Sequence, residues 1–513
     1  MRGRTQLCRD CRCRPLVAMR TIVWFRGKDL RVTDHEPLMR GSTTGEVIPL
    51  LVLEDSYFGS GDRSATDESQ GSRGKRPPHR LQFFLDAVTA LRSDLEAIGS
   101  TLVTVKGRAT EVVPRLAREW NADAVFAQAA VEPGSRRRDD VVAAALGERF
   151  RLFGGETVHP PGTLRTQAGR PYGVFSPFAK SWRREVAQVP AVGTPARLSR
   201  VPDNLVAIRS PIPDLVELGL ERNPAILRAG SSQADARLRR FLKDAGPAYK
   251  ADRDQMGIDG TSRLSADLKF GTIAPRRVWL EARAAIGETA GGMSFENELI
   301  WREFSYSTLW DVPTILTTPF QSDFEGFPWR DDENGWQAWV DGLTGYPVVD
   351  ASARQLRAEG YVHNRARMVS ASFLTKDLMI DFRRGERHYF HYLTDGDLAQ
   401  NTAGWQWTAG CGCDPQPYFR IFNPVSQGER FDPNGDYVRK WLPELRGMPS
   451  EFIHHPWDAP DSVLRGAKVR LGDTYPHPIV DHSVARERFL ETATRHLKRS
   501  PGSQSAPLRL PMD

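Results

Sequence analysis

Four motifs between Gly345 and Pro443 decide how this sequence folds: HNRARM (363–368), DGDLAQN (395–401), GWQW (404–407) and PYFRIFNPVSQGERF (417–431). Trp, Asn, Arg and paired Asp are denser here than structural packing requires, because charged side chains are seldom buried without a partner. Asn, Asp and Arg can hydrogen-bond the edge of a polar ring, and Trp can carry an electron. The motifs therefore predict a site for a redox-active planar ring, with the candidates Asn364, Arg365, Asp395, Asp397, Asn401, Trp405 and Trp407.

The sequence around this stretch has helical periodicity. After Gln233, segments such as ARLRRFLKD, NELIWREFSYSTLW and HNRARMVSASFLTKDLMIDF show helical spacing, and strand patterns nearly vanish. We therefore expect an all-α domain over residues 231–490.

The N-terminal part alternates between strand and helix patterns. Short apolar runs at 21–25, 47–53, 101–105, 124–128 and 150–153 have strand character, with amphipathic segments between them. This alternation predicts an α/β domain with a doubly wound parallel sheet over residues 19–153. WFRGKDLR follows the first strand where GxGxxG would mark a dinucleotide site, so the sheet is not expected to bind one.

The remaining segments connect or flank these domains. Residues 154–230 are rich in Pro, Gly and Arg and are expected to form a long connecting segment that wraps a surface. Residues 1–18 are interpreted as a disordered extension, or as a translation start assigned ahead of the true one at Met19. Their CxxCxC triplet lacks the fourth ligand that zinc requires, so no metal site is expected. The C-terminal tail, residues 491–513, is Pro- and Ser-rich from Ser500 onward and is also expected to be disordered.

Composition limits the class of protein. The chain has 513 residues, 40% hydrophobic and 26% charged, which allows large cores in two or three domains. A formal net charge of +6 is compatible with nucleic acid but does not establish it. No apolar run reaches the roughly 18 residues of a membrane span, so no membrane association is expected. The five cysteines form no disulfide framework, which favours a reduced, cytoplasmic location.

Taken together, the four motifs resemble the DNA photolyase/cryptochrome family, and the resemblance extends over roughly residues 20–490. Within the family the chain is most like a class I cyclobutane pyrimidine dimer photolyase. The resemblance implies FAD, bound non-covalently in a U-shape in the helical domain, and UV-damaged DNA as the partner of a monomer. It implies light-dependent repair, in which photoexcited reduced FAD passes an electron to a flipped-out dimer.

The resemblance assigns flavin-binding roles to several segments. Tyr249 and GTSRLS (260–265) resemble the segment that holds the flavin diphosphate, although an ordinary helix cap would also explain the hexapeptide. Arg367 and Asp395 match a salt bridge beside the isoalloxazine ring, and Asn401 matches the residue that faces its N5 atom. The expected set is Tyr249, Thr261, Ser262, Arg263, Leu264, Ser265, Arg302, Arg367, Asp395, Gly396, Asp397 and Asn401.

A second group resembles the family's lesion pocket. Glu298, Trp301 and Arg302 share one face of an expected helix, where a surface salt bridge over a half-buried Trp is the alternative interpretation. The resemblance makes Glu298 a hydrogen-bond partner of the dimer and Trp301 the ring that stacks on it. His363 is expected to transfer no proton. The expected catalytic residues are Glu298, Trp301, Asn364, Arg365, Met368, Asn401 and Trp407, and the expected DNA-binding residues are Arg253, Glu298, Trp301, Asn364, Arg365 and Gln427.

The electron supply departs from the family pattern. Trp405 and Trp329 match the inner and outer members of a three-tryptophan chain, but the middle position is Phe382. Phenylalanine is far harder to oxidise than tryptophan. We therefore predict slower photoreduction with intact repair, or a route through Trp407 or Tyr389. Two smaller departures are FRGKDLR (25–31), one residue longer than usual, and SYS (305–307), where an aromatic residue usually follows WREF.

Some assignments stay open. The family implies a second, antenna chromophore (a folate, deazaflavin or flavin), and in AVEPGSRRRDD (130–140) only Glu132 is recognisable as a folate-binding residue. A cryptochrome-type blue-light photoreceptor is disfavoured because the usual long C-terminal extension is missing. A photolyase restricted to single-stranded DNA would have a different lesion pocket. A non-flavin DNA-binding protein would leave the motifs unexplained.

Overall fold

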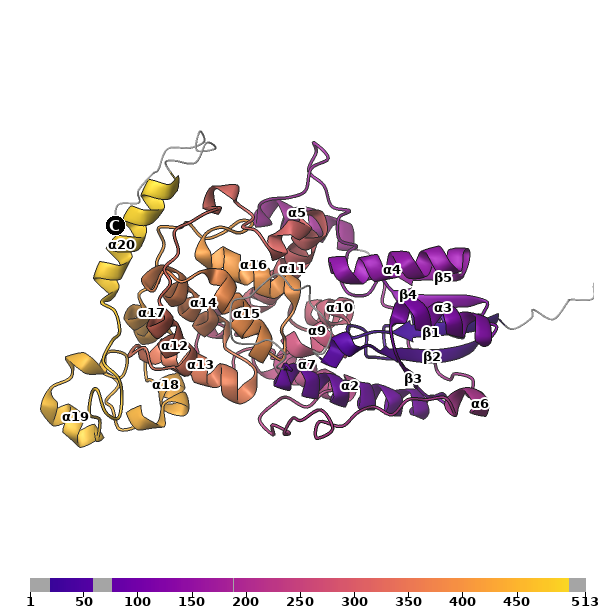
Figure 1. Ribbon diagram of the computed structural model, residues 1–513, viewed down its shortest axis with the longest axis horizontal. Helices are drawn as coiled ribbons and strands as arrows, with labels where there is room; N and C mark the ends of the chain where they lie inside the picture. The colour runs from indigo at the N-terminus through magenta and orange to yellow at the C-terminus, as the bar shows by residue number, and fades with distance from the viewer. Residues whose placement is uncertain (1–18, 59–75, 188, 498–513) are drawn as a thin grey trace, which may run out of the picture.

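The computed structural model describes residues 19–58, 76–187 and 189–497 of the chain. An α/β part and a helical part lie side by side along the long axis of the molecule (Figure 1). The expected architecture, a parallel-sheet domain followed by an all-α domain, is therefore confirmed.

The sheet of the N-terminal part has five parallel strands in the order β3-β2-β1-β4-β5. In the centre, Trp24 of β1 lies opposite Leu50 of β2 and Ala127 of β4. Strand order reverses between β1 and β4, so the loops after these two strands leave in different directions. The strands are β1 (Met19–Phe25), β2 (Gly45–Leu53), β3 (Val103–Lys106), β4 (Ala124–Gln128) and β5 (Phe150–Phe153).

Helices cover both faces of this sheet, because buried side chains alternate along each strand. Val23 and Phe25 share a core with two helices on one face, whereas Ile22 and Trp24 share a core with two helices on the other. The first face carries α1 (Glu36–Ser42) and α2 (Pro78–Ala97), and the second carries α3 (Ala109–Glu119) and α4 (Pro133–Leu146).

The connecting segment contributes to both parts. Leu215 and Ile226 pack into the core beneath α2, while Phe178 and Trp182 pack into the helical part. Phe178 and Trp182 belong to α5 (Phe175–Val186), and the only other helix within residues 154–230 of the described chain is α6 (Asp203–Val206). The segment therefore contacts the helical part first, through α5, and then returns to wrap the surface of the sheet domain.

The helical part is built around α16, which packs against α11, α14 and α15. Its helices are α7 (Ser231–Asp244), α8 (Tyr249–Asp252), α9 (Ser265–Phe270), α10 (Pro275–Ile286), α11 (Ala290–Asp311), α12 (Glu333–Asp341), α13 (Pro347–Glu359), α14 (Asn364–Ser372), α15 (Phe382–Tyr392), α16 (Leu398–Ala409), α17 (Pro424–Phe431), α18 (Asp436–Trp441), α19 (Asp461–Ala467) and α20 (His482–Leu497). Across the described residues, no helix combines the length and the apolar character that a membrane span requires.

The last helix ends later than expected. α20 continues to Leu497, past the boundary expected at residue 490, because Phe489 and Ala493 are one turn apart and both are buried. The tail therefore begins after this helix. The expectations of disorder for residues 1–18 and 498–513 lie outside the described residues.

Candidate functional site

Helix α16 carries three of the expected flavin-site residues. Asp397 is its N-cap and accepts hydrogen bonds from the backbone N–H groups of Ala399 and Gln400 at 3.1 and 3.2 Å. Asn401 and Trp405 follow at intervals of four residues and share one face with Asp397. Asn401 Nδ2 donates to the Glu386 carbonyl oxygen at 3.1 Å, which fixes the amide against α15.

The expected ion pair beside this helix is present. Arg367 Nη2 lies 2.8 Å from Asp395 Oδ2, and Arg367 Nε donates to the Val362 carbonyl oxygen at 2.8 Å. Asp395 Oδ1 is buried and has no hydrogen-bond partner among the described protein atoms. Buried polar atoms are nearly always paired in native proteins, so this oxygen is placed to accept from a bound molecule.

The start of α9, within GTSRLS, is not closed by a side-chain cap. The N-cap of α9 is Leu264, which offers no side-chain cap, and Ser262 Oγ accepts only a long bond of 3.4 Å from Leu264 N–H. Arg263 is held by Glu359 at 3.4 Å and by the Tyr361 ring at 3.8 Å. Its Nε is buried with no partner in the described structure. Hydroxyl, amide and guanidinium donors of this kind suit a diphosphate.

Tyr249 lies near this segment through α8. A Cβ on Gly260, the first residue of GTSRLS, would lie 3.0 Å from the Asp252 carbonyl oxygen, so the two segments are in direct contact. Arg302 of α11 donates to the carbonyl oxygens of Glu156 and Leu268, at 2.9 and 3.4 Å. The unpaired Asp395 oxygen and Arg263 nitrogen, together with the donors of GTSRLS, fit a flavin dinucleotide.

The expected lesion residues of α11 each have a specific neighbour. Glu298 forms an ion pair with Arg253, so these two expected DNA-binding residues meet. Burial raises the pKa of Glu298, and the charge of Arg253 only partly opposes this rise. Trp301 is stacked face to face on Phe175 of α5, with ring centroids 3.9 Å apart and an interplanar angle of 2°. Phe175 was not predicted from the sequence, since it lies in the connecting segment.

HNRARM forms the start of α14. Asn364 is exposed at its first position, and its Nδ2 lies 3.6 Å from Met368 Sδ. His363 caps the helix by accepting from Arg365 N–H at 3.2 Å. Burial lowers the pKa of His363 to about 4, so the imidazole is neutral at physiological pH. The expectation that His363 transfers no proton stays a prediction.

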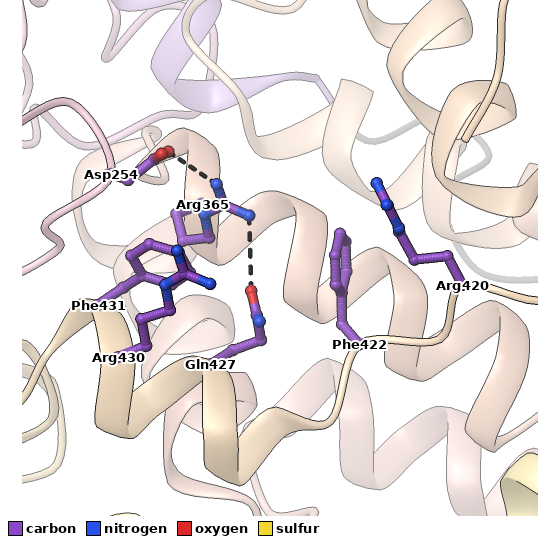
Figure 2. A pocket seen from close by; sticks show the side chains of 7 residues that line it. All are labelled: Asp254, Arg365, Arg420, Phe422, Gln427, Arg430 and Phe431. Atoms are coloured by element: carbon purple, nitrogen blue, oxygen red, sulfur yellow. Dashed lines mark hydrogen bonds and ion pairs between the residues drawn. The ribbon is translucent and has the colours of Figure 1, made fainter. Parts of the chain in front are cut away.

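A basic pocket lies beside α14 and α17, and Figure 2 shows its lining. Arg365 pairs with Asp254 at 2.9 Å, lies 4.2 Å from the Phe431 ring, and approaches Gln427 Oε1 at 3.5 Å. Arg365 and Gln427 were expected at a DNA contact. The pocket also contains Arg420 and Arg430, which stand on opposite sides of it. Neither arginine was among the residues expected from the sequence.

The aromatic residues around Trp405 form a branched cluster. Phe382 packs beside the outer Trp329, with ring centroids 6.3 Å apart, in the same core as Trp405. Trp405 contacts Tyr389 at 5.2 Å and Trp339 at 6.2 Å, measured between ring centroids. Among the described aromatic side chains, Trp405 makes no such contact with Trp407. Trp407 itself is half-buried on α16.

A second tryptophan extends this cluster toward the surface. Trp339 contacts Trp336, one turn earlier on α12, with ring centroids 5.4 Å apart, and Trp336 is only partly buried. This pair was not among the residues expected from the sequence. The spacing of the two indoles in GWQAW was the signal that could have found them.

Comparison with known proteins decides the family. Two family models match the chain: DNA photolyase over residues 21–196 and the FAD binding domain of DNA photolyase over residues 295–495. The deoxyribodipyrimidine photo-lyase of Agrobacterium fabrum is 38% identical over 91% of this chain and 96% of that protein. The chain belongs to the DNA photolyase family. The deoxyribodipyrimidine photo-lyase of Halobacterium salinarum is also 38% identical, over 91% of this chain and 97% of the relative.

Solved photolyase structures share the whole architecture. A bacterial class III photolyase from Agrobacterium tumefaciens is 35% identical with a TM-score of 0.83, covering 96% of this chain and 100% of that one. A Synechocystis cryptochrome is 28% identical with a TM-score of 0.82, covering 92% and 99%. These likenesses confirm the expected family, the enzyme type and the FAD-binding helical domain.

Proposed function

We propose that this photolyase repairs cyclobutane pyrimidine dimers in DNA, using light and non-covalently bound FAD. The observation that carries the proposal is the packing of α16 against both α11 and α14. Helix α16 presents Asn401 and Trp405, whereas α11 carries Trp301 and α14 carries Asn364. Residues suited to a flavin and residues suited to a damaged base pair are thus on neighbouring helices.

Bound FAD, when reduced and excited by light, supplies an electron that opens the cyclobutane ring and then returns. The protein holds both molecules and keeps water out. Arg367, fixed by Asp395, would supply a positive charge to a bound flavin, and the unpaired Asp395 oxygen would be available to accept a hydrogen bond. Asn401, held against α15, presents an amide to the same ring. Arg263 and the GTSRLS hydroxyls bind the diphosphate.

The lesion is held on the other side of α16. Trp301 stacks on the flipped-out bases, and Phe175 keeps its indole in one orientation from the opposite face. Glu298, whose pKa burial raises, hydrogen-bonds a base edge, and Asn364 offers an amide that both donates and accepts. The cost of flipping a damaged pair is smaller than for an intact one, which favours the lesion over normal DNA.

The basic pocket binds the backbone of the DNA. Arg365, Arg420 and Arg430 surround a cavity that has Asp254 as its only acidic side chain, so its net charge is positive. Such guanidinium groups contact phosphates without reading sequence, and binding should therefore weaken as salt increases.

We infer that photoreduction avoids Phe382 and runs from Trp405 through Trp339 to Trp336. The ring contacts of 6.2 and 5.4 Å form a continuous path of indoles, and the outer one is partly exposed. Tyr389 is a poorer carrier because its hydroxyl is buried against Ser352, 3.0 Å away, and burial raises the pKa of the phenol, which disfavours loss of its proton. We propose this path in place of the alternative electron-transfer routes through Trp407 or Tyr389 that were predicted from the sequence.

A second chromophore in the sheet domain is part of the proposal. One similar solved structure, a Sulfolobus tokodaii photolyase at 26% identity and a TM-score of 0.76, is described as holding two FAD molecules, with implication of a novel light-harvesting cofactor. In this chain, Glu132 forms an ion pair with Lys28 at 2.8 Å, so the recognisable folate-type carboxylate already has a partner. The class I assignment stays a prediction from the lesion-pocket residues.

The proposal is tested with oligonucleotides that carry one thymine dimer, in single- and double-stranded form. Purified protein with FAD should bind both in a gel shift and repair the duplex under blue light but not in darkness. Repair of single strands alone would instead assign the chain to the restricted type. FAD binding without repair of either substrate would contradict the proposal and favour a photoreceptor.

A further inference from the structure

The two smaller departures from the family pattern meet in the folded protein. Lys28, in the lengthened FRGKDLR motif, and Tyr306, in SYS, both contact the same oxygen of Asp397. Lys28 Nζ lies 2.6 Å from Asp397 Oδ2, and the Tyr306 hydroxyl donates to this oxygen at 2.7 Å. Segments 369 residues apart in sequence are thus joined at the N-cap of α16.

Lys28 links the two parts of the molecule through three carboxylates. Its Nζ lies 2.8 Å from Glu132 of the sheet domain and 2.7 Å from Glu156 at the start of the connecting segment, in addition to Asp397 of the helical domain. The three N–H donors of the ammonium group match its hydrogen bonds to Glu156, Asp397 and the Tyr306 hydroxyl, and Glu132 adds an ion pair. The Lys28 side chain is 16% exposed, so water screens these contacts only weakly.

The backbone of the same loop contacts the other half of the flavin site. Leu30 N–H donates to the Phe270 carbonyl oxygen at 3.2 Å, at the end of the helix that follows GTSRLS. Gly271 has a φ of +64°, and a Cβ there would lie 2.0 Å from the Lys28 carbonyl oxygen. Only glycine permits this approach. One loop of the sheet domain therefore touches both segments that were assigned to the flavin.

Charges on several elements face Asp397. Burial would raise the pKa of its carboxyl, but Lys28 and then Lys269 outweigh burial and hold that pKa well below its usual range. Lys269 of α9 is a weaker partner, because burial lowers its own pKa to about 8. Arg302 and Tyr306 lie on α11, and Lys28 is flanked by Glu132 of the sheet domain and by Glu156 of the connecting segment.

We propose that Lys28 is a positioning residue that keeps Asp397 ionised and fixed at the N-cap of α16, and thereby sets the reduction potential of the flavin. This inference rests on the proposed FAD site. With Lys28 present, the Lys28–Asp397 pair carries no net charge beside the ring. Without Lys28, the Asp397 carboxylate keeps only the weaker cationic partner Lys269, and its negative charge opposes the negative charge that reduction adds. In that variant, lowering the pH protonates the Asp397 carboxylate and removes its repulsion of the reduced flavin.

The test is the midpoint potential of the FAD-loaded protein at pH 6 and pH 8, by titration with dithionite. Dithionite supplies the electrons: the flavin takes up two electrons and one proton and gains one negative charge. Lys28→Met should lower the potential relative to the unmodified protein at pH 8, with a smaller difference at pH 6. Lys28→Arg keeps the charge and should restore the potential. Lys106→Met, the same change at an exposed site of the sheet domain, should leave it unchanged.

Equal potentials for Lys28→Met and the unmodified protein at both pH values would overturn the inference, as would a difference that does not depend on pH. Either result leaves the proposed repair activity standing. Failure of the unmodified protein to bind FAD would instead overturn both proposals. If Lys28→Met does not fold, Lys28→Gln removes the charge but retains a hydrogen-bond donor, and the same two comparisons decide.

Discussion

Trp301 should supply a large part of the protein's preference for damaged DNA. Its indole is half-buried on α11, and Phe175 stacks on it at 3.9 Å, so the ring is already ordered before DNA binds. Stacking of one base on an aromatic side chain contributes about 1–3 kcal/mol. Because the indole loses little further conformational entropy when DNA binds, Trp301→Ala should lose most of this stacking free energy. The affinity for dimer-containing DNA should then fall about 5- to 150-fold, since about 1.4 kcal/mol corresponds to tenfold.

The assay is a fluorescence-anisotropy titration of a dimer-containing duplex and of the same duplex without damage. Trp301→Phe keeps a ring and should lose less affinity than Trp301→Ala. Trp310→Ala, a half-buried tryptophan at the other end of the same helix, is the matched control and should keep lesion affinity. Affinity for undamaged DNA should change little in all three variants. An unchanged affinity of Trp301→Ala for the dimer would refute the placement of this indole in the lesion pocket.

Three further predictions concern electron supply, DNA contact and pH. Trp339→Phe should abolish fast photoreduction of oxidised flavin in flash photolysis and leave repair by pre-reduced protein intact. Phe382→Trp should speed photoreduction. Unchanged photoreduction in the Trp339→Phe variant would exclude the indole path. Arg420→Ala should weaken binding to damaged and undamaged duplex alike and reduce the slope of log affinity against log salt by about 1, in contrast to a base-reading residue. Burial raises the pKa of Glu386 to about 7, so folding stability should fall as pH rises from about 4.5 to 7, by up to about 3 kcal/mol. Glu386→Gln should remove this pH dependence of stability in urea unfolding. If the pH dependence persists in the variant, another group causes it.

The sheet and the helical part could be predicted from sequence because local patterns encode them. All five strands lie within two residues of their expected positions, since β-branched runs are bounded by turn signals on both sides. The end of the helical part was expected too early, at residue 490, whereas α20 ends at Leu497. Pro and Ser become frequent only after Leu497, and the burial of Ala493 depends on packing against distant residues. Local pattern cannot show such packing.

The contacts of the site likewise include some that were expected from the sequence and some that only the fold shows. Arg367 and Asp395 were expected as a pair, and the structure pairs them at 2.8 Å. The stacking of Phe175 on Trp301 and the contact of Lys28 with Asp397 were not expected. Each joins residues more than one hundred positions apart, and no periodicity in the sequence relates them. The departures in FRGKDLR and SYS were visible, but only the fold shows that Lys28 and Tyr306, which lie in these two motifs, contact the same oxygen of Asp397.

The central claim is that a flavin in the helical domain passes an electron to a dimer held against Trp301. The most direct test is anaerobic illumination of the pre-reduced, FAD-loaded protein with a thymine-dimer duplex in excess, with repaired DNA counted per protein molecule. The account predicts many repaired dimers per protein under blue light and none in darkness. Dimers that persist under illumination, although the duplex is bound and the flavin is reduced, would contradict it.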